Sequence, residues 1–439
     1  LYHCYMEVNV IGAGLAGSEA ALQLAKRGIK VKLYEMRPKN TTGAHTSEDC
    51  AEFVCSNSLG SFDITNASGL LKKEMELLNG ELIRIAYETQ VPAGGALAID
   101  RTGFSKRVTE KILNDTNIEL IRDEIAEIPN TPSIIASGPL TSSALADKIK
   151  EFTENKHLHF FDAIAPIVDA ESIDMTMAFW LNRYNKGEAS YINCPMNKQE
   201  YENFYNILIN APKIELKEFE KGAKFFESCL PIEVLASRGV DTLRFGPMKP
   251  IGLVDPRTNE ENYAVVQLRQ DNSAKTLFNL VGFQTNLKWG AQKELLHSIP
   301  GLENANIVRY GVMHRNTFIN SPAVLNASLQ TRKRKDLFFA GQITGTEGYT
   351  ESIASGLLAG INMVRYLNGE DLLILPKTTM LGALTQYITD PAHDKFQPIN
   401  SNWGIVDKIE LPKKERKNKK LKGEMLSNRS TEYMAGLEI

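Results

Sequence analysis

The chain has 439 residues, of which 43% are hydrophobic and 23% are charged, and its formal net charge is −3. This balance is typical of a globular protein with about two or three domains, and it excludes a uniformly basic nucleic-acid-binding protein. The five cysteines are an odd number scattered through a long chain, which favours reduced thiols in a cytoplasmic protein over a disulfide framework.

The first predicted elements form a βαβ unit at the N-terminus. Residues 8–11 read as a buried strand, residues 18–26 have helical spacing, and residues 31–34 form a second strand that ends in Glu35. A GxGxxG motif joins the first strand to the helix. Its glycines allow a tight turn, the approach of a pyrophosphate and close helix packing, while Glu35 can accept hydrogen bonds from an adenosine ribose. The predicted dinucleotide-binding residues are Gly12, Ala13, Gly14, Leu15, Ala16, Gly17 and Glu35.

Two cysteines follow this unit in the stretch HTSEDCAEFVCSNSLGS, residues 45–61. Cys50 and Cys55 have the C-x4-C spacing of flavin disulfide reductases, so a thiol-disulfide reductase is one alternative. The glycine-rich lead-in, the second nucleotide motif and the C-terminal His-Pro of such reductases are missing. Three neighbouring carboxylates also disfavour a thiolate at Cys50.

A second glycine-rich segment lies at residues 336–367. It reads as a strand, a glycine-rich turn and a long helix with small residues, which can hold a phosphate or the edge of a flavin ring. Together with the N-terminal motif and a short strand with an ASG turn at 134–139, it predicts the two halves of an FAD site. The predicted fold class is α/β, with a glutathione-reductase-like (Rossmann-type) FAD-binding domain. The cofactor-binding residues predicted in this segment are Gly341, Gln342, Gly348 and Tyr349.

Between these halves we predict an inserted α+β domain. Residues 263–270 and 276–289 alternate as in an antiparallel sheet, and residues 198–211 have helical spacing. The predicted division assigns residues 1–149 to the N-terminal part of the FAD-binding domain, 150–325 to the inserted domain on the side of RNA, folate and NAD(P)H, and 326–439 to the C-terminal part with its basic tail.

Several kinds of site have no motif in this sequence. No CxxC pair, HExxH motif or histidine cluster has metal-ligand spacing, so no metal is predicted. The N-terminus lacks the pattern of a signal peptide, and no apolar run approaches the ~20 residues that span a bilayer, so we expect no membrane partner. The lysine-rich run at 413–422 leaves a local contact with nucleic acid open.

Longer strings carry a resemblance to a known family. The strings are VCSNSL, VPAGGALAIDR, LRFGPMKPIGLVDPRT, NLVGFQTNLKWG, RYGVMHRNTFINSP and FFAGQITGTEGYTESIASG. They resemble the folate- and FAD-dependent tRNA uracil-5-methyltransferases, the TrmFO family, from about residue 8 to the basic tail. The nucleotide motif is similar to that of the related GidA (MnmG) tRNA-modifying flavoproteins.

The resemblance implies C5-methylation of a uridine in the T-loop of tRNA. Methylenetetrahydrofolate supplies the carbon and leaves as tetrahydrofolate, reduced FAD supplies electrons, and NADH or NADPH reduces the flavin. The same reaction on a uridine of 23S ribosomal RNA is the leading alternative. A flavoprotein that only binds RNA is a further one.

The predicted catalytic residues are Cys229 and Cys55. Uracil C5 is a poor nucleophile until a group adds at C6, and a thiolate suits that reversible addition. The resemblance places both cysteines at the flavin. Cys229, in FESCLPIE, is expected to attack C6, and Cys55 to act as acid, base or second thiol. The alternative for each is an ordinary buried packing residue. Candidate RNA phosphate contacts are Arg238, Arg244, Lys249, Arg257, Lys288, Arg315 and residues 332–335.

Overall fold

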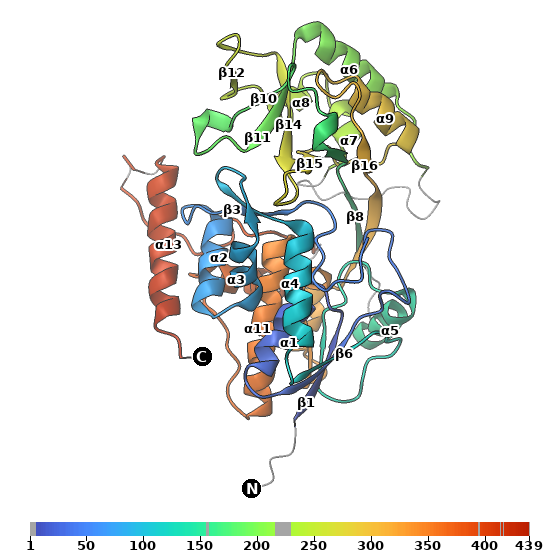
Figure 1. The fold of residues 1–439 in the computed structure, drawn as a ribbon. Coiled ribbons are helices and arrows are strands. Elements are labelled where there is room, and N and C mark those ends of the chain that lie inside the picture. Colours follow the sequence, from blue (N-terminus) through green and yellow to red (C-terminus); the bar gives the residue numbers. More distant parts are fainter. Residues whose placement is uncertain are drawn as a thin grey trace.

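Two sheets, each with its own hydrophobic core, are joined by a two-stranded ribbon (Figure 1). The computed structural model of the protein describes residues 6–154, 158–215, 230–393, 396–412, 414–415 and 417–438, with the backbone alone at 158–162, 314 and 315. Within this part of the chain, no helix is both long enough and apolar enough to cross a membrane.

The first sheet has five parallel strands and combines both ends of the chain. In spatial order they are β18 (Leu337–Phe339), β7 (Ser133–Ile135), β1 (Glu7–Ile11), β2 (Lys30–Tyr34) and β6 (Ile118–Ile121). Strand β7 and most of β1 are buried on both faces, as is usual for a parallel sheet covered by helices. The C-terminal segment therefore enters the same sheet as the N-terminal βαβ unit, through β18 beside β7.

Two helices, α1 (Leu15–Ala25) and α11 (Tyr349–Leu367), pack tightly against each other beside this sheet (Figure 1). Small residues allow the contact: a Cβ added at Gly356 would lie 2.2 Å from the carbonyl oxygen of Ala16. The small residues of this predicted helix thus serve packing between the two ends of the chain. The predicted helix at 18–26 starts earlier than expected, at Leu15.

The second sheet has six antiparallel strands. Their order is β10 (Phe179–Trp180), β11 (Tyr191–Met196), β14 (Ala264–Gln270), β15 (Leu277–Leu280), β9 (Ile167–Asp169) and β16 (Ile307–Arg309). Helices α6 (Lys198–Asn210) and α9 (Trp289–His297) contribute to its core. The predicted strand at 276–289 is wrong beyond Leu280, because Gly282 turns the chain at φ +76° and packs on Pro247.

The ribbon consists of β8 (Leu158–Ala163) and β17 (Met313–Phe318), which pair antiparallel over their whole length. The chain leaves the first sheet through β8 and returns through β17, so both crossings lie side by side (Figure 1). The remaining elements are β3 (Ser58–Ser61), β4 (Gln90–Val91), β5 (Ala96–Ile99), β12 (Val254–Asp255), β13 (Glu260–Glu261), α2 (Ala67–Leu77), α3 (Glu81–Glu88), α4 (Arg101–Leu113), α5 (Ser143–Thr153), α7 (Ile232–Ser237), α8 (Thr242–Phe245), α10 (Ser321–Val324), α12 (Met380–Ile388) and α13 (Lys419–Ala435), with 3₁₀ turns η1 (Ala170–Ser172), η2 (Arg183–Asn185) and η5 (Gln342–Thr344).

A buried carboxylate, Glu74, joins three helices near the C-terminus. Glu74 lies on α2 and accepts hydrogen bonds from the backbone N–H groups of Met380 and Leu381 at 2.6 and 2.7 Å, at the start of α12. The hydroxyl of Ser430 on α13 also donates to it. Burial raises the pKa of Glu74 from 4.5 to about 7, although these hydrogen bonds oppose the shift.

We expect the Glu74→Gln variant to gain stability relative to the unchanged protein as pH rises from 5 to 8. Between 4.5 and about 7 the folded protein holds a proton that the unfolded chain has released. Its stability therefore falls through this window, by ~3 kcal/mol at most, while an amide does not titrate. Thermal midpoints of both proteins at pH 5 and pH 8 test this. Glu110→Gln, at an exposed position of α4, is the control and should show no such change.

Candidate functional site

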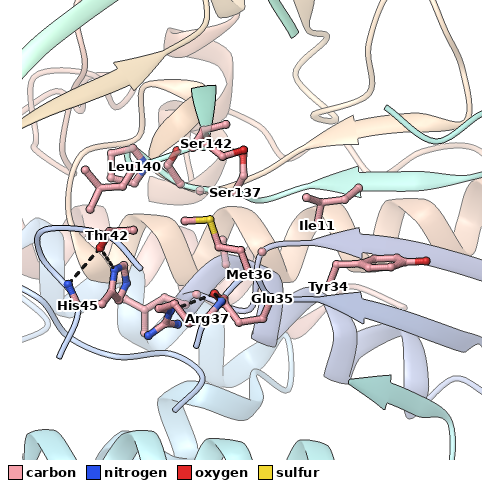
Figure 2. Close-up of a pocket in the computed structure, with 18 of the residues that line it drawn as sticks. Ile11, Tyr34, Glu35, Met36, Arg37, Thr42, His45, Ser137, Leu140 and Ser142 are labelled. Carbon is pink, nitrogen blue, oxygen red and sulfur yellow. Dashed lines mark hydrogen bonds and ion pairs between the residues drawn. The ribbon is translucent and has the colours of Figure 1, made fainter. Parts of the chain in front are cut away.

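A pocket opens at the carboxyl ends of β1, β2, β7 and β18 (Figure 2), the edge at which parallel α/β sheets bind ligands. Both ends of the chain and the ASG turn after β7 contribute to its wall. Eight of the predicted cofactor residues line it: Gly12, Gly14, Leu15, Ala16, Glu35, Gly341, Gln342 and Tyr349. The structure thus brings together two glycine-rich segments that are more than 300 residues apart in the sequence.

The centre of the pocket suits a pyrophosphate. A Cβ built on Gly14 would have no heavy atom of the described residues within 4 Å, so the backbone there faces open space. No described side chain caps the N-terminus of α1, and no acidic residue stands in its first turn. The N–H groups of that turn are therefore free to bind an anion. Gly17 lies behind this turn, where a Cβ would meet the carbonyl oxygen of Gly12 at 1.7 Å.

Glu35 directly follows β2 and is the acidic residue predicted to contact the ribose. Its carboxylate is nearly buried. One oxygen accepts the backbone N–H of Ala13 at 3.1 Å, and the other accepts two N–H groups of Arg37 at 3.0 Å. Burial alone would raise the pKa of Glu35, but the charge and hydrogen bonds of Arg37 lower it on balance. A carboxylate has about four acceptor positions, so one oxygen retains room for a ribose hydroxyl.

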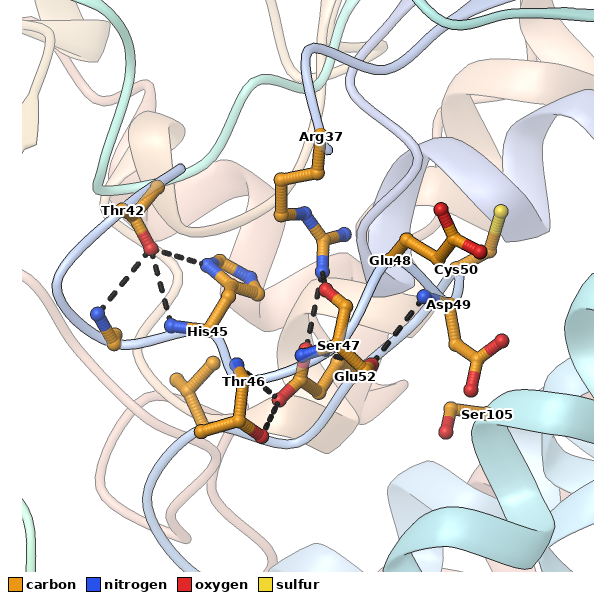
Figure 3. Close-up of polar contacts among 12 residues, drawn as sticks. Arg37, Thr42, His45, Thr46, Ser47, Glu48, Asp49, Cys50, Glu52 and Ser105 are labelled. Carbon is orange, nitrogen blue, oxygen red and sulfur yellow. Dashed lines mark hydrogen bonds and ion pairs between the residues drawn. The ribbon is translucent and has the colours of Figure 1, made fainter. Parts of the chain in front are cut away.

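The loop after β2 closes this end of the pocket around Glu52 (Figure 3). Its carboxylate accepts hydrogen bonds from the backbone and hydroxyl groups of Thr46 and Ser47, and from Arg37 at 3.1 Å. Arg37 thereby bridges Glu35 and Glu52. In the same loop, the hydroxyl of Thr42 and Nδ1 of His45 form a hydrogen bond of 2.6 Å. No pattern in the sequence predicts this support, because the loop that provides it carries no motif.

The opposite end of the pocket is built by the C-terminal segment. Gly341 has a φ of +83°, and its N–H donates to the hydroxyl of Ser355 at 2.7 Å. Gln342 donates to Glu347 at 2.7 Å. Gly348, with a φ of +112°, precedes the first residue of α11, Tyr349. These residues shape a rigid turn that can face the ring of a flavin.

Cys55 meets Tyr349 at this end. The backbone N–H of Cys55 donates to the Tyr349 hydroxyl at 2.6 Å, and that hydroxyl donates to the Cys55 sulfur at 2.8 Å. Tyr349 also stacks on Phe53, with 4.3 Å between ring centroids. Burial raises the pKa of Tyr349 well above 10, so the phenol stays protonated and can donate to sulfur. The contact joins residues 294 positions apart.

Cys50 lies in a different environment. It is a free, fully buried thiol, and burial raises its pKa to about 11. A thiol in that state is a weak nucleophile near neutral pH. This counts against the C-x4-C reductase alternative and fits a packing role for Cys50. Cys194 is also buried, in the core of the second sheet.

Two predicted features lie partly outside the described residues. Cys229 falls in the segment 216–229, so its place relative to the pocket stays a prediction. Among the predicted RNA contacts, the side chain of Arg315 is also not described. Arg244 lies 3.5 Å above the ring of Tyr263, and Arg257 pairs with Asp255 at 2.7 Å. A phosphate would have to compete with these contacts.

Within the described ranges, no cluster of His, Cys, Asp and Glu could hold a metal ion.

Comparison with known proteins assigns the family. The family model of glucose inhibited division protein A matches residues 7–371. Methylenetetrahydrofolate--tRNA-(uracil-5-)-methyltransferase TrmFO of Bacillus licheniformis is 56% identical over 430 residues, covering 98% of each chain. The protein of the same name from Anoxybacillus flavithermus is 56% identical over 94% of this chain and 96% of its own.

A solved structure supports the fold. Aquifex aeolicus GidA aligns with a TM-score of 0.71 at 17% identity, covering 100% of this chain and 75% of that chain. This confirms the predicted fold class, an FAD-binding fold with a Rossmann-type parallel sheet. The lining of the pocket is compatible with FAD: Glu35 can accept a ribose hydroxyl, the N–H groups of the α1 turn can bind a pyrophosphate, and the Gly341 turn can face a flavin ring. The resemblance noted in the sequence is confirmed, and the chain belongs to the TrmFO family within the wider glucose inhibited division protein A family.

Proposed function

We propose that this protein forms 5-methyluridine in the T-loop of tRNA, with methylenetetrahydrofolate as carbon donor, FAD as cofactor and NADH or NADPH as reductant. Relatives that are 56% identical over nearly the whole chain carry the tRNA, the folate and the uracil-5-methyltransferase activity in their names. The observation that carries the proposal is the contact between Cys55 and Tyr349 at the flavin end of the pocket. We infer that this contact supplies the acid–base pair that completes the transferred carbon.

The reaction needs a nucleophile, a base and an acid from the protein. A nucleophile must add to uracil C6 so that C5 can attack the methylene carbon, and we assign this to Cys229. A base must then remove the C5 proton, and an acid must assist the departure of tetrahydrofolate. Reduced FAD would supply the two electrons that convert the methylene group to methyl.

Cys55 and Tyr349 suit the proton transfers. Since the Tyr349 hydroxyl accepts the N–H of Cys55, its own proton points to the sulfur, which serves as the acceptor. That arrangement stabilises a thiolate and lets the pair hold one proton between two atoms 2.8 Å apart. The stacked ring of Phe53 keeps the phenol in place and excludes water from one face.

Nucleoside analysis tests the proposal directly. Purified protein is incubated with methylenetetrahydrofolate, NADH or NADPH, and either unmodified tRNA or fragments of 23S ribosomal RNA. We expect 5-methyluridine in the T-loop of tRNA. Methylation of the ribosomal fragments alone would establish the alternative substrate, and reduction of a disulfide with no 5-methyluridine in either RNA would reject a methyltransferase.

The role of Cys229 can be tested with RNA that carries 5-fluorouridine at the target position. Fluorine at C5 blocks the removal of a proton, so the adduct between enzyme and base should accumulate. We expect the adduct, seen as a band that resists denaturing electrophoresis, to be lost in Cys229→Ala and kept in Cys194→Ala, whose thiol is fully buried. An undiminished adduct in Cys229→Ala would move the nucleophilic role to another residue.

A further inference from the structure

The backbone that carries Cys55 is held by two arginines, the buried Arg101 and the half-buried Arg309. Three successive carbonyl groups, at residues 53, 54 and 55, each accept a hydrogen bond from a guanidinium. Arg101, the first residue of α4, donates to Phe53 at 2.6 Å and to Cys55 at 3.2 Å. Arg309, at the end of β16, donates to Val54 at 2.9 Å. We refer to Arg101 and Arg309 as the arginine clamp.

The clamp reaches the loop from two different sheets. Arg101 belongs to the helices around the first sheet, whereas Arg309 belongs to the second sheet. Asp271, just after β14, accepts two hydrogen bonds from Arg101, at 2.8 and 3.2 Å, and is itself buried. Arg309 also donates to Ala44 at 2.8 Å, in the loop that closes the cofactor pocket. Through Arg309 the second sheet therefore holds the chain at two points, at Ala44 before Cys50 and at Val54 next to Cys55.

A neighbouring amide extends the same connection. Asn57 is fully buried and donates to the carbonyl oxygens of Ile99 and Gln270 at 2.9 and 2.8 Å. Its own oxygen accepts from Arg269 and Asn279 of the second sheet, at 3.2 and 3.1 Å. Buried groups of this kind are costly unless every one is paired, and such fully paired networks favour one arrangement of the chain.

The two guanidinium groups are close enough to repel each other. Burial lowers the pKa of Arg309, and the charge of Arg101 lowers it further. Two like charges repel each other, so they stay together here only because the loop between them accepts their hydrogen bonds. The carbonyl groups of residues 53–55 and the carboxylate of Asp271 supply that compensation. The loop and the clamp thus depend on each other.

We propose that Arg309 is a positioning residue for the Cys55 thiol: it ties the loop of Cys55 to the second sheet and so holds the sulfur at the Tyr349 hydroxyl. The proposal rests on the proposed function for its consequence in catalysis, but the position of the thiol can be measured without RNA or folate. The second sheet then does more than cover the pocket, because its Arg309 and Asp271 set the geometry of a thiol that the first sheet carries.

Site-resolved alkylation tests the proposal. Reduced protein is treated with iodoacetamide at pH 8, and each cysteine is followed by peptide mass spectrometry. In Arg309→Ala we expect Cys55 to react at least about fivefold faster, because the released loop opens toward solvent. Cys50 and Cys194, both fully buried, should keep their rates. A wild-type rate at Cys55, or a parallel rise at all three cysteines, would overturn a specific positioning role.

Two further variants sharpen the result. Arg183 also donates to backbone carbonyls, those of Lys249 and Ile251, but away from the Cys55 loop. Arg183→Ala should therefore leave alkylation of Cys55 unchanged. Arg309→Lys keeps the charge without the planar fork and should restore only part of the protection.

If the proposed function holds, kcat for 5-methyluridine formation in Arg309→Ala falls at least about tenfold, with a KM for tRNA within about twofold of the unchanged protein. A KM effect with an unchanged kcat would contradict the positioning role. If the unchanged protein forms no 5-methyluridine, the proposed function fails, while the alkylation result still decides the role of Arg309.

Discussion

Replacing Cys55 with alanine is expected to slow 5-methyluridine formation by about 10²- to 10⁴-fold, the range in which a positioned acid or base contributes. The substitution removes the sulfur that accepts the hydrogen bond of the Tyr349 hydroxyl at 2.8 Å, so the pair could no longer carry the proton transfers that we propose for it. Single-turnover formation of 5-methyluridine at saturating tRNA and methylenetetrahydrofolate measures this step. FAD content should remain that of the unchanged protein, since Cys55 does not line the pocket.

Cys50→Ala is the matched control for this experiment. It removes a thiol five positions away that is fully buried and whose pKa is raised to about 11. We expect a modest loss of thermal stability from the lost packing and a rate within about twofold of the unchanged protein. If the two variants lose activity to the same degree, Cys55 acts through the fold of its loop and not through its thiol.

The Gly14→Val variant should lose FAD and yet remain folded. The backbone of Gly14, with φ −75° and ψ −164°, is extended, and valine adopts such values readily. A side chain there would project into the open space of the pocket, where we expect the pyrophosphate. We expect the affinity for FAD to fall by about 100-fold or more, roughly 3 kcal/mol of binding free energy. The absorbance of the purified protein and titration of the apoprotein with FAD measure the change.

Gly290→Val is the control for steric effects at a helix N-terminus. Gly290 stands in the first turn of α9, and a Cβ there also has no described heavy atom within 4 Å. Both valine variants should have similar thermal midpoints without FAD. FAD should raise the midpoint of Gly290→Val alone, because only a bound ligand stabilises the folded state. Retention of yellow FAD by Gly14→Val would show that the pyrophosphate lies elsewhere.

Both sheets contribute residues to the region in which we expect the TrmFO reaction to take place. The first sheet carries the pocket in which we expect the dinucleotide, and α11 brings Tyr349 to Cys55. The second sheet reaches into the same region through Arg309 and Asp271. An enzyme that must meet a flavin, a folate and an RNA base at one point benefits from such rigid support, because misplacement by about 1 Å can cost two orders of magnitude in rate.

The sequence by itself determined the elements whose signals are local. The spacing of three glycines between two apolar runs predicted β1, α1 and β2, because a tight turn and a helix N-terminus need those residues within a few positions of each other. The same holds for the turn at Gly341 and the helix after Tyr349. The strings shared with the TrmFO family identified it over nearly the full chain, as the comparisons confirm.

Only the tertiary structure decided which individual side chains meet between these pieces. The hydrogen bond between Cys55 and Tyr349 spans 294 positions, and that between Arg309 and Val54 spans 255. No periodicity encodes such pairs, since they arise when two sheets pack and buried polar groups must find partners. The same requirement separates Cys50 from Cys55: identical thiols five residues apart differ because one is enclosed in the core and the other faces a phenol at the pocket.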